Sequence, residues 1–169
     1  MGQLSVARDA EYTEYVLARL EWLRRVAYLL CQDWHGADDL VQATITKLFT
    51  HWGRARVVDN LDAYVRTILV RTFIAERRSS WFRRVVLPGY HEDRPAADHD
   101  ADARLDVREA LATLPPRQRA TLVLRFYCDL PVGQTADILG CSSGTVKSQT
   151  AKGLAALRRE LTPVAARGD

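Results

Sequence analysis

The pattern that most constrains the fold lies near the C-terminal end of the chain, where one short helical segment stops and another starts within three residues. Val132 to Leu139 has the apolar spacing of a short helix, Gly140 follows it, and Ser142 precedes a second helical segment that continues to Leu161. Glycine ends a helix in the left-handed backbone conformation without a steric penalty, and serine accepts a hydrogen bond from the first N–H groups of the next helix. This segment therefore predicts two helices joined by a tight turn.

Three residues around this turn have the spacing of a helix-turn-helix motif. Ala136 and Gly140 are four residues apart, and Val146 follows six residues later. A small residue lets the helices approach closely, the glycine forms the turn, and the β-branched residue holds the second helix against the first. An ordinary helical hairpin also needs a glycine and a cap, but a polar, basic outward face favours DNA bases and phosphates. We predict that this face carries Thr145, Lys147, Ser148, Gln149, Ala151 and Lys152.

Helical periodicity also covers most of the remaining sequence. Before residue 85 it predicts three helices, over 11–30, over about 36–52 and over 61 to about 84, which together make a compact three-helix domain. The second would begin near Gly36, so that the carboxylates of Asp38 and Asp39 complement the positive end of its dipole. Two more helices, over 105–114 and 117–128, flank a pair of prolines, and the second proline suits a first helical turn.

Charge is distributed unevenly along the chain, although the net charge is only +3. Residues 54–84 carry eight arginines against three carboxylates, whereas residues 91–109 sum to −4. The stretch 91–102 has no large apolar residue and no helical period, so we expect a mobile charged linker without the scaffold that a metal site needs. The predicted fold is all-α, with two small helical domains, 9–84 and 105–164, joined by a flexible acidic linker, 85–104, and with the helix-turn-helix in the second domain.

Several other protein classes are disfavoured by composition. The longest uncharged apolar run, 26–31, is far shorter than the roughly 20 residues that span a bilayer, and the first residues lack the basic and apolar segments of a secretory signal. We expect a cytoplasmic protein without membrane insertion. Cys31, Cys128 and Cys141 fit small buried residues in a reducing compartment better than a disulfide or zinc site, with a redox-sensing thiol as the alternative. We expect no cofactor and no metal.

Two separate segments together resemble one known family. Residues 114–127 and 136–148, which run from Leu-Pro-Pro-Arg-Gln-Arg to Gly-Thr-Val-Lys-Ser, are similar to region four of the extracytoplasmic-function sigma factors of bacterial RNA polymerase. Residues 38–44, Asp-Asp-Leu-Val-Gln-Ala-Thr, are similar to their region two, where Asp-Leu-Val-Gln-Glu is usual. The resemblance covers about residues 11–161, with both motifs in the expected order. It implies a protein that binds core polymerase, directs it to promoters and has no catalytic activity of its own.

The resemblance also implies three sets of contact residues. Asp38, Asp39 and Gln42 would bind core polymerase, at the clamp-helices coiled coil of the β′ subunit, and the β subunit is expected as a further partner. The minus-thirty-five promoter element would lie against Ser143, Thr145, Lys147, Ser148, Ala151 and Lys152. The minus-ten element would be opened and read by the loop 57–60 and the following helix, through Asn60, Arg66, Arg71, Arg77, Arg78, Trp81 and Arg84, with arginines on phosphates and aromatic rings on exposed bases.

Some positions depart from the family pattern. Arg71 stands where Asn is common near the flipped minus-ten base, Gln149 replaces a frequent Arg, and Ala43 replaces the Glu after Gln42. The promoter sequence of relatives is therefore not carried over to this chain. Many relatives are held inactive by an anti-sigma factor, and we expect such a partner here.

Two other functions remain open at this point. A stand-alone helix-turn-helix regulator would bind operator DNA without polymerase. A hydrolase would use His35 with Asp38 and Asp39, but no Ser or Cys nucleophile motif, phosphate-binding glycine loop or metal pair accompanies them.

Overall fold

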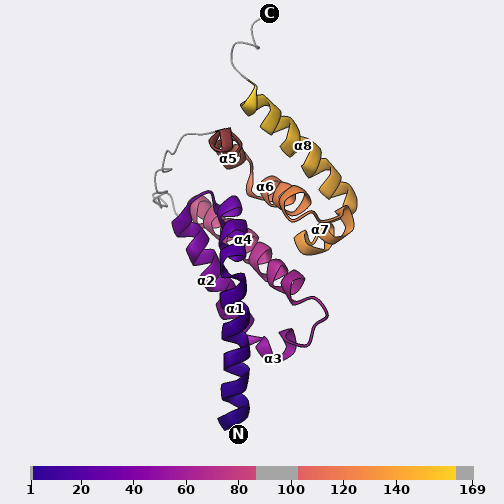
Figure 1. The fold of residues 1–169 in the computed structure, drawn as a ribbon. Helices are drawn as coiled ribbons and strands as arrows, with labels where there is room; N and C mark the ends of the chain where they lie inside the picture. The colour runs from indigo at the N-terminus through magenta and orange to yellow at the C-terminus, as the bar shows by residue number, and fades with distance from the viewer. Residues whose placement is uncertain (1, 87–102, 163–169) are drawn as a thin grey trace, which may run out of the picture. The chain divides into compact units, whose positions relative to one another are not determined.

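Helices make up nearly all of the computed structural model, which describes residues 2–86 and 103–162 (Figure 1). No strand occurs among these residues, so the predicted all-α class is confirmed. The α-helices are α1 (Gly2–Cys31), α2 (Trp34–Thr50), α3 (Trp52–Ala55), α4 (Leu61–Val86), α5 (Ala103–Thr113), α6 (Pro116–Leu122), α7 (Val132–Leu139) and α8 (Ser143–Leu161), and a π-helix, η1 (Val123–Tyr127), follows α6.

The chain divides into two compact units, Met1–Ala75 and Glu76–Asp169. The first contains α1, α2, α3 and most of α4, and the second contains α5 to α8. The division falls inside α4. The acidic stretch 91–102 lies outside the described residues, so the linker, and the domain boundaries that depend on it, stay predictions.

In the first unit α2 runs back along α1, and the two helices share an apolar core. The hydroxyl of Tyr12 in α1 donates a hydrogen bond of 2.8 Å to the carbonyl oxygen of Ile45 in α2. Burial of apolar surface, worth about 25 cal/mol per Å², is the main attraction between such helices. The completely buried side chains of the pair include Leu23, Ala27, Leu30, Leu40 and Leu48.

The start of α2 differs from the prediction. The helix begins at Trp34, because the Asp33 carboxylate accepts a hydrogen bond of 2.6 Å from the Gly36 N–H and so caps the helix. A Cβ at position 36 would lie 2.9 Å from this carboxylate, so the glycine leaves room for the cap. Asp38 and Asp39 lie in the second turn rather than at the positive end of the dipole, and the prediction of their role there was wrong.

The end of α2 also differs, because the predicted helix over about 36–52 is interrupted at His51. α2 stops at Thr50 and the one-turn helix α3 starts at Trp52, so the first half of the chain contains four helices instead of three. Trp52 is only 2% exposed, and the rings of Tyr12 and Tyr15 lie 5.4 and 5.8 Å from it. The break between α2 and α3 directs this indole into the core. The apolar spacing of the sequence runs on through residue 52 and did not reveal the break.

In the second unit the predicted turn between α7 and α8 is confirmed. Gly140 has φ +61° and ends α7, and two hydrogen bonds, from the N–H of Gly140 to Asp137 and from that of Cys141 to Ala136, close the helix end in a Schellman motif. Ser142 caps α8 by accepting a hydrogen bond of 3.1 Å from the N–H of Thr145. Ala136 and Val146 are buried, as the spacing of the motif requires.

The segment before α7 departs from the predicted helix over 117–128. α6 ends at Leu122, and the next turn widens into η1, with a hydrogen bond of 2.9 Å from the N–H of Cys128 to the carbonyl of Val123. Such widened turns are rare and often occur at functional sites.

The close packing of α6 on α8 was not predicted either. Gly153 of α8 is buried, and a Cβ at this position would lie 2.9 Å from a methyl carbon of Leu122 in α6.

The left-handed turn at Gly140 predicts a selective cost for a side chain. Gly140→Ala should lower the free energy of unfolding by about 1–2 kcal/mol, because alanine is strained at positive φ even where space is open. Gly133→Ala is the matched control, since Gly133 is exposed in α7 with open space around its Cα, and it should be neutral or stabilising by up to about 1 kcal/mol. Urea unfolding followed by circular dichroism measures both; equal losses in the two variants would contradict the assigned turn.

Candidate functional site

The residues predicted to bind polymerase form an exposed strip on α2. Asp38, Asp39 and Gln42 are all exposed, while Leu40 and Val41 between them are buried. Asp39 lies near a neighbour on its own helix, with 3.6 Å between its Oδ2 and Nε2 of His35. Its side chain is 72% exposed and accessible to a partner.

Asp38 is engaged differently. Its two carboxylate oxygens accept hydrogen bonds of 2.6 and 3.2 Å from Nε and Nη2 of Arg24 in α1. A two-point pair of this kind fixes both side chains. Asp38 therefore ties α2 to α1, in addition to lying on the strip.

The predicted DNA-facing residues of the second unit lie together on α8. Thr145 is half-buried and its hydroxyl lies 2.9 Å from that of Ser142. Gln149 does not belong to the outward face as predicted: it is half-buried, and its Oε1 is buried without a hydrogen-bond partner among the described residues. The exposed members are Ser143, Lys147, Ser148, Ala151 and Lys152.

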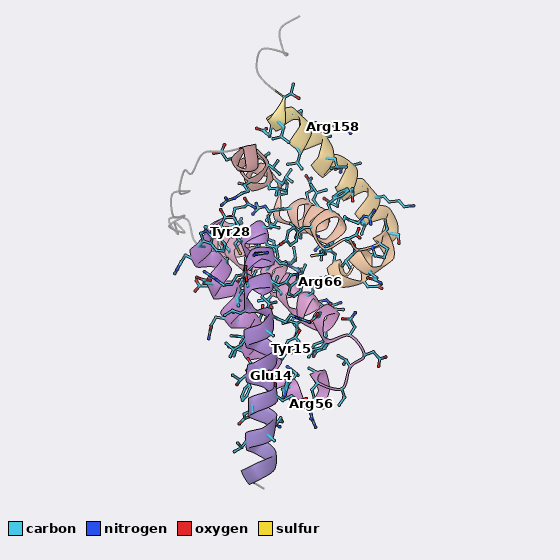
Figure 2. All side chains as sticks on the ribbon, viewed as in Figure 1. Glu14, Tyr15, Tyr28, Arg56, Arg66 and Arg158 are labelled. Atoms are coloured by element: carbon cyan, nitrogen blue, oxygen red, sulfur yellow. The ribbon has the colours of Figure 1, made fainter. Side chains whose placement is uncertain are left out.

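Two residues of the predicted minus-ten set make contacts within the protein. Asn60 caps α4, with its Oδ1 accepting a hydrogen bond of 2.9 Å from the N–H of Ala63. Arg66, labelled in Figure 2, lies on α4. Its guanidinium carbon is 5.5 Å from the ring centroid of Trp22, a cation–π contact. Both side chains thus have a structural role whether or not they touch DNA.

The other members of this set differ in their exposure. Arg71 and Arg78 are exposed, and Arg77 is half-buried. The side chains of Trp81 and Arg84 lie outside the described residues, so their predicted stacking and phosphate contacts stay predictions.

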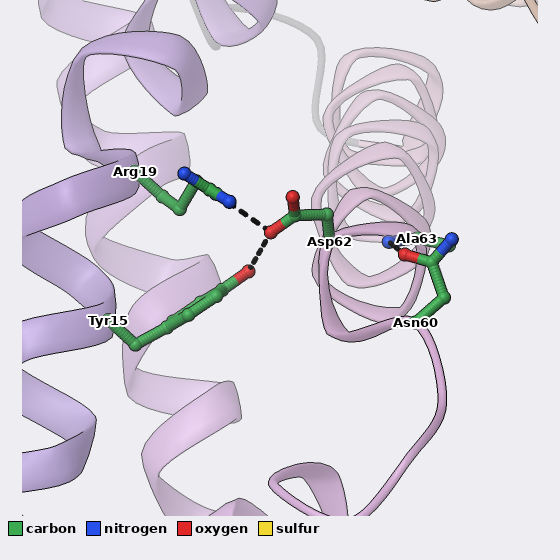
Figure 3. Close-up of polar contacts among 5 residues, drawn as sticks. All are labelled: Tyr15, Arg19, Asn60, Asp62 and Ala63. Atoms are coloured by element: carbon green, nitrogen blue, oxygen red, sulfur yellow. Dashed lines mark hydrogen bonds and ion pairs between the residues drawn. The ribbon is translucent and has the colours of Figure 1, made fainter.

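A contact cluster that the sequence did not reveal holds the loop between α3 and α4. Asp62, in the first turn of α4, accepts hydrogen bonds of 2.8 Å from the Tyr15 hydroxyl and 2.9 Å from Nε of Arg19, both on α1 (Figure 3). At the other end of the loop Arg56 pairs with Glu11 at 3.1 Å. Partners more than 40 residues apart leave no periodic signal, so only the folded chain shows them.

These contacts set the charge states in the cluster. The hydrogen bond from Arg19 lowers the pKa of Asp62, and burial, reinforced by Asp62, raises the pKa of Tyr15. The loop that they anchor presents Val57, which is 73% exposed, together with Val58 and Asp59. An exposed apolar side chain on an anchored loop is suited to contact a base or a partner.

Other kinds of site have less support among the described residues. No three His, Cys, Asp or Glu side chains in them gather to hold a metal ion, and none of their helices is long and apolar enough to cross a membrane. His35 and its neighbouring carboxylates are exposed on a helix surface. Cys31 is buried, Cys128 and Cys141 are partly buried, and none of the three forms a disulfide.

Comparison with known proteins places both units in one family. Residues 16–83 match the family model described as Sigma-70 region 2, and residues 104–157 match that of Sigma-70, region 4. The RNA polymerase sigma-E factor of Streptomyces coelicolor is 33% identical over 158 residues, which cover 89% of this chain and 86% of the relative. The ECF RNA polymerase sigma factor SigL of Mycobacterium tuberculosis is 32% identical, with 95% and 96% covered.

A solved structure is similar over both units. It is the sigma factor RpoE from Bartonella quintana, in complex with the anti-sigma factor NepR. It covers 89% of this chain and 96% of its own, with 27% sequence identity and a TM-score of 0.70.

The lowered pKa of Asp62 predicts an acid-sensitive contribution to stability. Because the folded state binds this proton less tightly than the unfolded state, the stabilisation is present above the ordinary aspartate pKa of about 4 and is lost as the pH falls through the lowered value. Asp62→Asn should cost up to about 1 kcal/mol at pH 7, since the ion pair is partly exposed and screened, and much less near pH 2. Urea unfolding at both pH values measures this.

The control is Asp59→Asn, which removes a carboxylate from the adjoining loop and should leave stability nearly unchanged. If Asp62→Asn had the stability of the unmodified protein at pH 7, the cluster would not anchor the loop.

Proposed function

The chain belongs to the extracytoplasmic-function sigma factors of RNA polymerase. From this membership we propose which of its residues bind polymerase and which bind promoter DNA. The strip Asp38, Asp39 and Gln42 binds the β′ subunit of core polymerase. The minus-thirty-five element is bound by the α8 face, which consists of Ser143, Thr145, Lys147, Ser148, Ala151 and Lys152. The observation that carries this proposal is that Asp39 and Gln42 are exposed on a helix whose inner face is buried, while a capped helix-turn-helix occupies the other unit. No catalytic step and no cofactor are part of it.

Asp39 and Gln42 are the proposed direct contacts with β′. A carboxylate and an amide three residues apart lie on the same side of a helix, about 5 Å along its axis, and offer acceptors and donors for arginine or asparagine side chains. Asp38 contributes through its pair with Arg24, which fixes the position of the strip on α1.

The α8 face is proposed to contact the promoter in the major groove. The Ser142 cap holds the start of α8, where free N–H groups attract a phosphate, and Lys147 and Lys152 add positive charge along the exposed side. Ser143, Thr145, Ser148 and Ala151 are small enough to let the helix approach base edges. Gln149 is left out of this contact set because its oxygen is buried.

The minus-ten element is proposed to meet the anchored loop and α4. Val57 and Val58 are presented by the loop, and Arg71 and Arg78 are exposed on the helix for phosphate contact. Asn60, through its cap of α4, and Arg66, through its contact with Trp22, support this surface. Arg77, Trp81 and Arg84 remain proposed contacts. Because Arg71 stands where relatives commonly have Asn, the base preference at this position is proposed to differ from theirs.

An anti-sigma factor is the proposed regulatory partner. The similar sigma factor of Bartonella quintana forms a complex with an anti-sigma factor, and this chain exposes apolar side chains in both units. The second candidate function, a stand-alone regulator, shares only the helix-turn-helix. A gel shift with and without core enzyme distinguishes the two, since only the regulator binds its DNA tightly alone.

Removing the side chains of Asp39 and Gln42 should weaken the binding of this protein to core polymerase. Asp39→Ala combined with Gln42→Ala is expected to weaken binding to core RNA polymerase by about a hundredfold, the effect of truncating two central interface residues. Fluorescence anisotropy of labelled protein titrated with core enzyme measures it. Glu14→Ala with Glu21→Ala, two exposed residues on α1, is the control. Unchanged affinity in the Asp39/Gln42 variant would refute the assigned face.

The lysines of α8 should contribute to promoter binding through phosphate contacts. Lys152→Ala is expected to reduce the slope of log affinity against log salt concentration by about one, when holoenzyme binds a promoter fragment. Arg8→Ala, an exposed cation on α1, changes the net charge equally and should leave the slope unchanged. An identical slope for Lys152→Ala would place this residue outside the DNA interface.

A further inference from the structure

Trp34, the first residue of α2, is a large aromatic side chain that the proposed function does not use. It is 48% exposed, whereas Trp52, the other tryptophan at the start of a helix in this unit, is only 2% exposed. Its indole is nevertheless held in place. The ring of Tyr28 lies 4.2 Å away, centroid to centroid, with the two planes inclined by 31°, and the guanidinium carbon of Arg24 lies 5.2 Å from the indole centroid.

Asp38 completes this arrangement, because it fixes the same Arg24 with two hydrogen bonds of 2.6 and 3.2 Å. We call Arg24, Tyr28, Trp34 and Asp38 the Trp34 cluster. It holds an accessible aromatic surface in one orientation. Ordering this side chain on binding would therefore cost little entropy, and preorganised aromatic residues are frequent at the centre of protein interfaces.

The Trp34 cluster is continuous with the proposed polymerase-binding strip. An α-helix turns by about 100° per residue, so residues four apart lie nearly above one another. Trp34, Asp38 and Gln42 therefore form one row along α2, about 12 Å long, and Asp39 lies beside it. A rod-shaped partner that covers Asp39 and Gln42 reaches Trp34 when it extends one or two turns toward the start of α2.

We infer that Trp34 is part of the surface that binds the β′ subunit of core RNA polymerase, with Asp38 and Arg24 as the residues that position it. This rests on the proposed function, because β′ must lie on Asp39 and Gln42. Asp39, beside the row, offers an exposed carboxylate, and Trp34 offers an aromatic face. Both suit arginines of the partner, because a guanidinium pairs with a carboxylate and stacks on an aromatic ring. The interface of this chain with β′ thus has an aromatic part beyond the Asp-Leu-Val-Gln motif.

Core binding of three variants tests the inference. Trp34→Ala should weaken binding to core RNA polymerase by about tenfold or more, and Trp34→Phe should retain most of the affinity because it keeps a ring face. Asp38→Asn, which leaves Asp39 and Gln42 unchanged but weakens the two-point pair with Arg24, should give an intermediate loss. Leu17→Ala removes another exposed apolar side chain, 68% exposed on α1, and should bind as the unmodified protein does.

A measurement on the unmodified protein avoids any effect of substitution on folding. Hydroxyl-radical footprinting should show Trp34 protected in the complex with core enzyme and reactive in the free protein. If Trp34 stays equally reactive, or if Trp34→Ala binds core normally while the Asp39/Gln42 variant does not, the inference is wrong and the proposed function stands. If the Asp39/Gln42 variant also binds core enzyme normally, the assigned polymerase-binding strip is wrong, and so is the inference about Trp34 that depends on it.

Discussion

Side-chain caps fix where the three functional helices begin. Asp33 caps α2, Asn60 caps α4 and Ser142 caps α8, each by accepting a hydrogen bond from the N–H three residues later. Each cap satisfies an N–H group that the first turn of a helix leaves without an intrahelical partner, and so fixes the residue at which the helix starts. The packed apolar residues then decide which side faces outward: Leu40 and Val41 are buried while Asp39 is exposed, and Val146 is buried while Lys147 is exposed.

The C-terminal unit could be predicted from sequence in more detail than the N-terminal one. Gly140 and Ser142 are residue types with narrow backbone roles, and they act within a few residues of their partners, so their pattern was sufficient. At the start of α2 the dipole argument placed Asp38 and Asp39 at the positive end of the helix, whereas the helix starts earlier and is capped by Asp33. The cap geometry of Asp33 depends on the space that Gly36 leaves, which composition does not show.

The contacts that join distant parts of the chain were not predictable. Tyr15 and Arg19 meet Asp62 across more than 40 residues, and Arg24 meets both Asp38 and Trp34, because α2 and α4 pack beside α1. They change how the candidate residues act: Asp38, Asn60 and Arg66 were predicted as contacts, and each also supports the fold. Sequence resemblance supplied the family, whereas the structure separates exposed residues from supporting ones.

The central claim is that this chain converts core RNA polymerase into a promoter-specific enzyme. Run-off transcription with purified core enzyme and genomic promoter fragments tests it most directly. We expect transcripts of discrete length that appear only when core enzyme and this protein are both present. Absence of any such transcript, together with tight binding of the protein to the same fragments without core enzyme, would contradict it and favour a stand-alone regulator.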